Sequence, residues 1–147
     1  MKHTRLFLCA LAVFILDRLA KVFWQSADFV LIPGVLAIRS TQNTGMAFGI
    51  LPGGTMYLIA VSILLLIIAL IWLLRKKELP RLVQWGAGLM GGGALGNLFD
   101  RIFYGHVIDM LDVIFHDFFI FNPADVGVVL GAALLGMYLL KGESTHT

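Results

Sequence analysis

The chain has 147 residues, of which 59% are hydrophobic and only 14% are charged, with a mean hydropathy of +0.90. A soluble domain carries about a quarter of its residues as charges, and a disordered chain is poor in apolar residues, so both classes are excluded. The net charge of +2 excludes the basic surface of a nucleic-acid-binding protein, and a single cysteine excludes an internal disulfide framework, which leaves one small integral membrane domain spanning residues 1–147.

Four apolar segments are long enough to cross a bilayer as helices, which requires ~20 residues each. The first has the basic start and apolar run of a signal peptide, but no small-x-small cleavage site follows that run. Asp17 and Lys21 instead continue a helical spacing as an i,i+4 pair with the acid first, so an uncleaved span is expected. The expected spans cover residues 6–24, 55–74, 82–99 and 124–140, with outer segments at 25–54 and 100–123.

The two outer segments contain short β-type patterns. Residues 29–39 are rich in Val, Ile and Leu around a Pro33-Gly34 turn, and residues 106–121 are β-branched and aromatic. They predict short strands in a small sheet on the membrane surface. The expected fold is therefore mainly α, a four-helix transmembrane bundle with a small β-containing extracytoplasmic portion.

Glycines spaced four residues apart occur in the last two spans, where small residues let helix backbones approach closely. We expect them to serve packing within one chain rather than dimerisation, so a monomer is predicted. The pairs are Gly88 and Gly92, Gly92 and Gly96, and Gly127 and Gly131.

The basic residues predict the orientation. With four spans, both termini and the turn between spans two and three lie on one side, which the positive-inside rule makes the cytoplasm. The basic residues on that side are Lys2, Arg5, Arg75, Lys76, Lys77, Arg81 and Lys141. Most acidic residues lie at or beyond the outer ends of the spans, so the chemistry is expected near the outer face.

Ionisable residues at membrane depth are candidates for function. In the segment Asn122-Pro123-Ala124-Asp125, Asn suits a helix N-cap and Pro the first helical position, but the carboxylate at the bilayer edge requires a further reason. Asn97 and Arg101 are spaced i,i+4 at the end of span three. The structural alternative for Asp100 and Arg101 is a mutually compensating interfacial pair.

Other chemistries find less support. The group His106, Asp109, Asp112, His116 and Asp117 is weak evidence for a metal site, because a strand sends alternate side chains to opposite faces. There is no Gly-x-Ser-x-Gly motif, and Cys9 lies on the opposite side from the acids. Paired carboxylates are the remaining hydrolytic machinery, in which one holds a proton and the other takes one from water. The residue pattern leaves open which two acids pair.

Five motifs in chain order carry a resemblance to a known family. They are Asp17-x-x-x-Lys21, Asn43-Thr-Gly-x-Ala47-Phe48, Gly-Gly-Ala-Leu-Gly-Asn97-Leu-Phe-Asp100-Arg101, Gly105-x-Val-Ile-Asp109 and Phe121-Asn122-x-Ala124-Asp125. On these motifs the chain resembles lipoprotein signal peptidase (signal peptidase II), a family of bacterial membrane aspartic peptidases. Departures from the family pattern at Met110, Pro123 and Val126 remove neither a carboxylate nor its Asn neighbour.

The resemblance implies that Asp109 and Asp125 form the catalytic dyad. It also implies supporting or substrate-binding roles for Asn43, Asn97, Asp100, Arg101 and Asn122, whereas Asp17 and Lys21 are assigned here to structure first. The implied substrate is a prolipoprotein carrying diacylglycerol on its lipobox cysteine, cut just before that cysteine in the bacterial plasma membrane. No metal or organic cofactor is implied, membrane lipid is the expected surrounding, and residues 43–49 are the expected mobile cover.

Two other function classes remain open at this stage. A small proton-coupled transporter would also have four spans and membrane acids, but it would more naturally place an acid near the centre of a span. A scaffold protein would carry its acids as surface decoration and would tolerate Asp-to-Asn substitutions. The peptidase is preferred to both.

Overall fold

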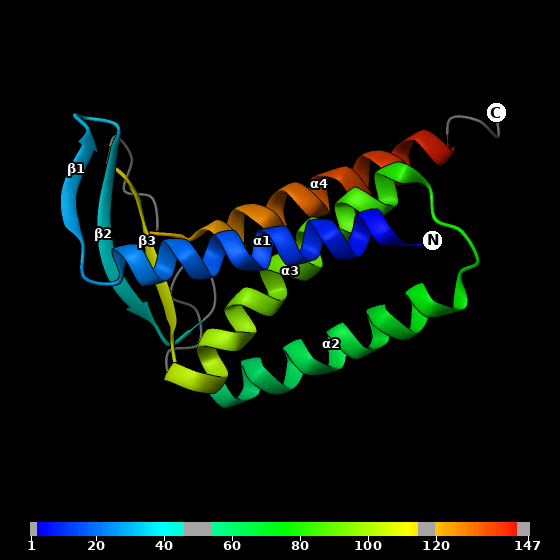
Figure 1. The fold of residues 1–147 in the computed structure, drawn as a ribbon, viewed down its shortest axis with the longest axis horizontal. Coiled ribbons are helices and arrows are strands. Elements are labelled where there is room, and N and C mark those ends of the chain that lie inside the picture. The colour runs from blue at the N-terminus through cyan, green and yellow to red at the C-terminus, as the bar shows by residue number, and fades with distance from the viewer. Residues whose placement is uncertain (1–2, 46–53, 115–119, 144–147) are drawn as a thin grey trace.

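The computed structural model describes residues 3–45, 54–114 and 120–143. Within these ranges the chain forms four helices and three strands (Figure 1). The helices are α1 (Thr4–Trp24), α2 (Thr55–Arg75), α3 (Arg81–Tyr104) and α4 (Pro123–Glu143), and the strands are β1 (Asp28–Ile32), β2 (Leu36–Asn43) and β3 (Val107–Val113). The four helices cover the four segments that the sequence predicts as spans.

The strands form one antiparallel sheet in the order β1-β2-β3. The hairpin between β1 and β2 turns at the predicted Pro33-Gly34, where Gly34 has a φ of +71° and the Val35 N–H donates to the Ile32 carbonyl at 3.0 Å. β3 covers only the first part of the predicted strand at 106–121, and residues 115–119 lie outside the described residues. The sheet caps one end of the helices, opposite the start of α1 and the end of α4 (Figure 1).

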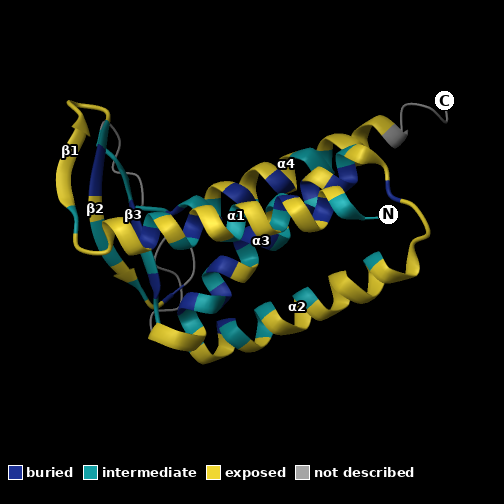
Figure 2. Ribbon diagram, in the orientation of Figure 1, coloured by how far each residue is buried: buried dark blue, intermediate teal, exposed yellow. Residues whose placement is uncertain are grey.

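The helix packing centres on α3, which lies against both α1 and α4. Glycines on α3 permit the close approach: a Cβ on Gly92 would lie 2.5 Å from the Ala10 carbonyl oxygen of α1. On another face of α3, a Cβ on Gly86 would lie 3.1 Å from the Gly131 carbonyl oxygen of α4. Gly92 and Gly131 therefore serve packing within the chain, as predicted, and Gly86, which the prediction did not include, does so too. α2 packs chiefly against α3, and its side chains are largely exposed (Figure 2).

The distribution of polar and apolar side chains is reversed from that of a soluble protein. The largest fully buried side chains include Lys21, Asp17, Asp100 and Asn122. Exposed positions along α1 and α2 instead carry large apolar side chains. α2 and α4 are long and apolar enough to cross a membrane by length and composition.

Two features bring the chain from α3 into the sheet. Gly105 ends α3 in the left-handed region, with a φ of +76°, and its N–H donates to the Arg101 carbonyl. A residue with a Cβ would be strained in this conformation. β3 then pairs with β2 so that Asp109 lies opposite Thr41, and the chain returns at Phe121, which bridges to Leu111 before α4 begins. This path places the middle of β3 beside the start of α4.

Candidate active site

Two carboxylates, one from a strand and one from a helix, share a single bridging residue at the sheet end of the helices. Asp109 comes from the middle of β3, and Asp125 lies in the first turn of α4. Asn122 Nδ2 donates to Asp109 Oδ1 at 2.6 Å, and the Asn122 backbone N–H donates to Asp125 Oδ2 at 3.2 Å. The fold therefore brings together two acids that no single strand or helix could pair.

The start of α4 fixes the position of Asp125. Asn122 Oδ1 accepts a hydrogen bond from the Asp125 N–H at 2.9 Å, while the Asp125 carboxylate accepts from the Asn122 N–H. This reciprocal pair has the form of a capping box, with Asn122 at the N-cap, Pro123 first in the helix and Asp125 third. The predicted helix start is confirmed, and the cap holds the Asp125 side chain at the helix end.

Two further asparagines satisfy the remaining carboxylate oxygens. Asn43 Nδ2, at the end of β2, donates to Asp109 Oδ2 at 3.0 Å, and Asn97 Nδ2 on α3 donates to Asp125 Oδ1 at 2.7 Å. Each of the four carboxylate oxygens therefore accepts a hydrogen bond from an Asn residue. The predicted residues Asn43, Asn97 and Asn122 lie at one site with the two acids.

Burial sets the proton affinity of Asp109, which is only 2% exposed. Desolvation, reinforced by the nearby charge of Asp125, raises the pKa of Asp109 from 3.8 to about 6. The hydrogen bonds from Asn43 and Asn122 and the charge of Lys21 oppose this rise. A carboxyl group with such a pKa can hold a proton at mildly acidic pH and can act as a general acid.

Beneath the two acids lies a cluster of four charged side chains, which we call the ionic cluster: Asp17, Arg18, Lys21 and Asp100. Arg18 contacts Asp17 at 2.7 Å and Asp100 at 2.6 Å. Lys21 Nζ contacts the same two carboxylates at 3.0 Å and 2.7 Å. Two acids and two bases balance each other, which is the condition under which charges tolerate burial.

The structure does not have the alternative arrangement, in which Asp100 and Arg101 compensate each other. Asp100 is ion-paired across to α1, with Arg18 and Lys21. Arg101 turns toward the loop after β2, where its guanidinium donates to the Gly45 carbonyl at 2.9 Å. Adjacent residues on a helix point in different directions, so they do not face each other. Asp100 therefore supports the ionic cluster, and Arg101 lies on the side of the two catalytic candidates.

Comparisons with known proteins agree with this geometry. Residues 9–141 match the family model described as signal peptidase (SPase) II. The chain belongs to the signal peptidase II family. Relatives named lipoprotein signal peptidase include that of Halothermothrix orenii, 38% identical over 93% of this chain and 96% of its own, and that of Syntrophomonas wolfei, 42% identical over 88% and 89%. A solved bacterial membrane enzyme matches with a TM-score of 0.90 and 34% identity, covering 97% of this chain and 91% of its own.

Membership in this family makes the protein a peptidase of the aspartic class, located in a bacterial membrane. Among the residues that the structure describes, no three His, Cys, Asp or Glu side chains are grouped so as to hold a metal ion. His116 and Asp117 of the weak metal pattern lie outside the described residues. So do Ala47 and Phe48 of the second motif and most of the expected cover at 43–49.

Sequence reasoning missed Arg18 and assigned too little to Asp17 and Lys21. Lys21 Nζ donates to Asn97 Oδ1 at 3.2 Å, and Asn97 in turn donates to Asp125, so the ionic cluster reaches the site through one amide. One signal was available: three ionisable residues within an apolar span are functional candidates by default. Their partners on α3 are far away in the sequence and become visible only in the fold.

Proposed function

We propose that Asp109 and Asp125 are the catalytic dyad of an aspartic endopeptidase that removes signal peptides from diacylglyceryl-modified prolipoproteins, cutting before the lipidated cysteine. The observation that carries this proposal is that Asn122 donates a hydrogen bond to both carboxylates. Its side-chain Nδ2 donates to Asp109 at 2.6 Å, and its backbone N–H donates to Asp125 at 3.2 Å. Membership in the signal peptidase II family and the names of the relatives supply the substrate class.

The chemistry follows from the different surroundings of the two acids. The raised pKa of Asp109 favours its protonated form, from which it donates to the carbonyl oxygen of the scissile bond. Asp125 lies in the first turn of a helix, where unpaired N–H groups stabilise a negative charge. Ionised Asp125 accepts a proton from water, and the oxygen of that water attacks the carbonyl carbon. The tetrahedral intermediate then collapses: the carbon–nitrogen bond breaks, the cysteine nitrogen takes the proton that Asp125 accepted from water, and a hydroxyl of the intermediate returns a proton to Asp109 as the new carboxyl group forms.

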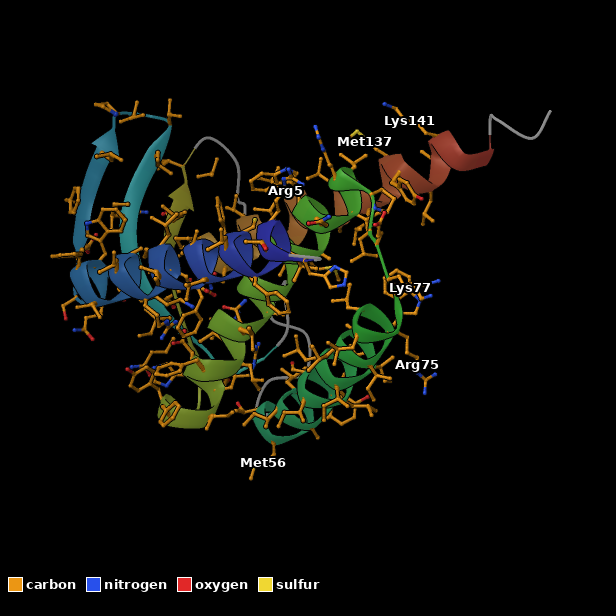
Figure 3. All side chains as sticks on the ribbon, turned by 45° about the vertical axis from the view of Figure 1, so that its right-hand side comes forward. Arg5, Met56, Arg75, Lys77, Met137 and Lys141 are labelled. Carbon is orange, nitrogen blue, oxygen red and sulfur yellow. The ribbon has the colours of Figure 1, made fainter. Side chains whose placement is uncertain are left out.

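The membrane placement is supported by where the charges and apolar side chains lie. Figure 3 shows Arg5, Arg75, Lys77 and Lys141 at the end of the helices away from the sheet. Cytoplasmic segments are enriched in Lys and Arg, so this end faces the cytoplasm, with both termini, and the dyad lies near the outer face. Large apolar side chains such as Leu16 and Leu65, 61% and 59% exposed, suit helices that face lipid, so all four helices cross the membrane.

Access for the substrate fits the loose packing of α2. Only Leu58 of this helix belongs to the described core, and α2 packs chiefly against α3. A substrate whose acyl chains remain in lipid needs a lateral route to the dyad, and the side of the bundle at α2, where the packing is thinnest, is the route that we propose. The working unit is a single chain, because both carboxylates and their four Asn contacts come from one chain.

The test is cleavage of a diacylated prolipoprotein by the purified protein in detergent, with the product identified by mass. The Asp109→Asn and Asp125→Asn variants are expected to lose ~10³-fold or more in turnover, because each removes a general acid or base. The double variant is expected to be little worse than either single one, since the two groups act as a unit. Asp28→Asn on β1 is the matched control, because its side chain is 83% exposed.

Two results would contradict the proposal. Near-normal cleavage by either single variant would remove that aspartate from the dyad. Cleavage of the unlipidated precursor at the same rate would show that the diacylglycerol is not part of the recognised substrate.

A further inference from the structure

The ionic cluster holds the backbone at two points, each just before a dyad residue. Asp17 Oδ1 accepts a hydrogen bond from the Ala124 N–H at 3.1 Å, and Asp100 Oδ2 accepts one from the Ile108 N–H at 3.1 Å. Ala124 precedes Asp125, and Ile108 precedes Asp109. The two acceptors therefore set where β3 and α4 carry their catalytic carboxylates.

Arg18 is the residue that joins the two acceptors. Its guanidinium contacts Asp17 at 2.7 Å and Asp100 at 2.6 Å, and it also donates to the Gly96 carbonyl at 3.3 Å. Both carboxylates are fully buried. The guanidinium carbon lies 4.8 Å from the centre of the Phe99 ring, which is within the range of a cation–π contact.

Lys21 cannot replace Arg18. An ammonium group has three donors, and Lys21 Nζ already contacts Asp17, Asp100 and Asn97. Without Arg18, one base would face two buried acids. One of these acids would then take up a proton, or Lys21 would leave Asn97, and either change disturbs the groups that support the dyad.

We infer that Arg18 is a positioning residue for the reaction: by bridging Asp17 and Asp100, it holds the two N–H acceptors that set the spacing of Asp125 and Asp109. The inference rests on the proposed dyad, and it goes beyond it by assigning the reaction geometry to a residue that touches neither carboxylate of the dyad. The loss of Arg18 should lower turnover and leave substrate affinity nearly unchanged.

The test compares Arg18→Gln, which removes the charge, with Arg18→Lys, which keeps it on a single nitrogen. Arg39→Gln is the matched control, because Arg39 also bridges two aspartates, Asp28 and Asp112, but on the sheet. For Arg18→Gln we expect kcat to fall at least tenfold with KM within twofold. Arg18→Lys should lose about threefold in kcat, and Arg39→Gln should stay within twofold of the wild type.

Amide hydrogen exchange supplies a readout that is independent of cleavage. In Arg18→Gln, the amides of Ile108 and Ala124 should exchange at least tenfold faster than in the wild type. Wild-type kcat together with wild-type exchange in this variant would overturn the inference, as would a large rise in KM at constant kcat. If Arg18→Gln fails to fold, Arg18→Lys decides, because its single nitrogen cannot replace the two guanidinium nitrogens that contact Asp17 and Asp100 separately. Unchanged exchange at both amides and unchanged kcat in this variant would overturn the inference.

The two proposals fail in different ways. If the wild-type protein does not cleave the lipidated substrate, the proposed function fails, while the exchange of the two amides still tests whether Arg18 holds the backbone. If the wild type cleaves, Asp109→Asn is inactive, and Arg18→Gln matches the wild type in both readouts, only the role of Arg18 fails.

Discussion

The raised pKa of Asp109 predicts a specific dependence of stability on pH. Asp109→Asn removes the titrating group while keeping the size and shape of the side chain. The shift from 3.8 to about 6 corresponds to about 3 kcal/mol, and Asp109 is only 2% exposed, so solvent screening reduces this figure little. The folded protein is therefore less stable by about 3 kcal/mol when Asp109 is ionised than when Asp109 is protonated.

The sign of the effect follows from which state loses its proton first. Because the folded pKa lies above the unfolded one, the unfolded chain ionises near pH 4 while the folded protein still holds the proton. The contribution to stability is therefore full below pH 4 and is lost as the pH rises through about 6. Relative to Asp109→Asn, the wild type should lose about 2 kcal/mol of unfolding free energy between pH 4 and pH 7, because the unfolded chain is already partly ionised at pH 4.

The assay is denaturant unfolding in detergent micelles at several pH values from 4 to 8. The absolute difference between the two proteins also contains the cost of placing an amide against the Asn43 and Asn122 donors, so the change of that difference with pH is the quantity to compare. Asp125→Asn is a second reference: it removes a charge that raises the Asp109 pKa, so the loss should become smaller. Parallel stability profiles for the wild type and Asp109→Asn from pH 4 to 8 would refute this account.

Three further predictions concern packing, the polar shell and topology. Gly93→Ala places a methyl group against a carbonyl in the first turn of α4, so it should destabilise the protein by about 1–3 kcal/mol and reduce cleavage. Gly91→Ala places its methyl group in open space and should be tolerated, and equal effects of the two substitutions would contradict the packing. Arg101→Ala removes the hydrogen bond to the Gly45 carbonyl in the loop after β2, so turnover should fall about tenfold or more while the unfolding temperature changes little. Full activity of this variant would limit Arg101 to an interfacial role. In a cysteine-free background, a cysteine at the exposed position Glu78 should be labelled from the cytoplasmic side, and a cysteine at the exposed position Asp28 from the outer side. The opposite labelling pattern would show that the protein has the reverse orientation in the membrane.

Local sequence patterns were sufficient to predict those features of the fold that neighbouring residues determine. The start of α4 could be predicted because Asn122, Pro123 and Asp125 each suit a defined capping position, and the structure has the corresponding hydrogen bonds. The pair of Asp17 and Lys21 was likewise predictable from its spacing and forms at 3.0 Å. In both cases the partners lie within one helical turn.

Contacts between distant segments could not be predicted in this way. The sequence left open a pair between Asp100 and its neighbour Arg101, yet the partners of Asp100 lie on α1, because helix geometry turns adjacent side chains away from each other. The pairing of Asp109 with Asp125 could be predicted only from the family resemblance, because the residue pattern did not distinguish these two acids from the others. What selects them is the register of β3 on β2 and the return of the chain at Phe121, which are tertiary features.

The arrangement of charges gives a physical reason why the proposed dyad should hold one proton. The ionic cluster is neutral by itself, because Asp17 and Asp100 face Arg18 and Lys21. Arg101 is the further base whose charge interacts with both dyad acids. With both dyad acids ionised, the site would hold one negative charge in excess in a poorly solvated place, and with both protonated it would hold one positive charge in excess. With one proton shared between the two acids, the dyad together with Arg101 is neutral, as the ionic cluster already is. This is the state in which one acid can donate a proton while the other accepts one.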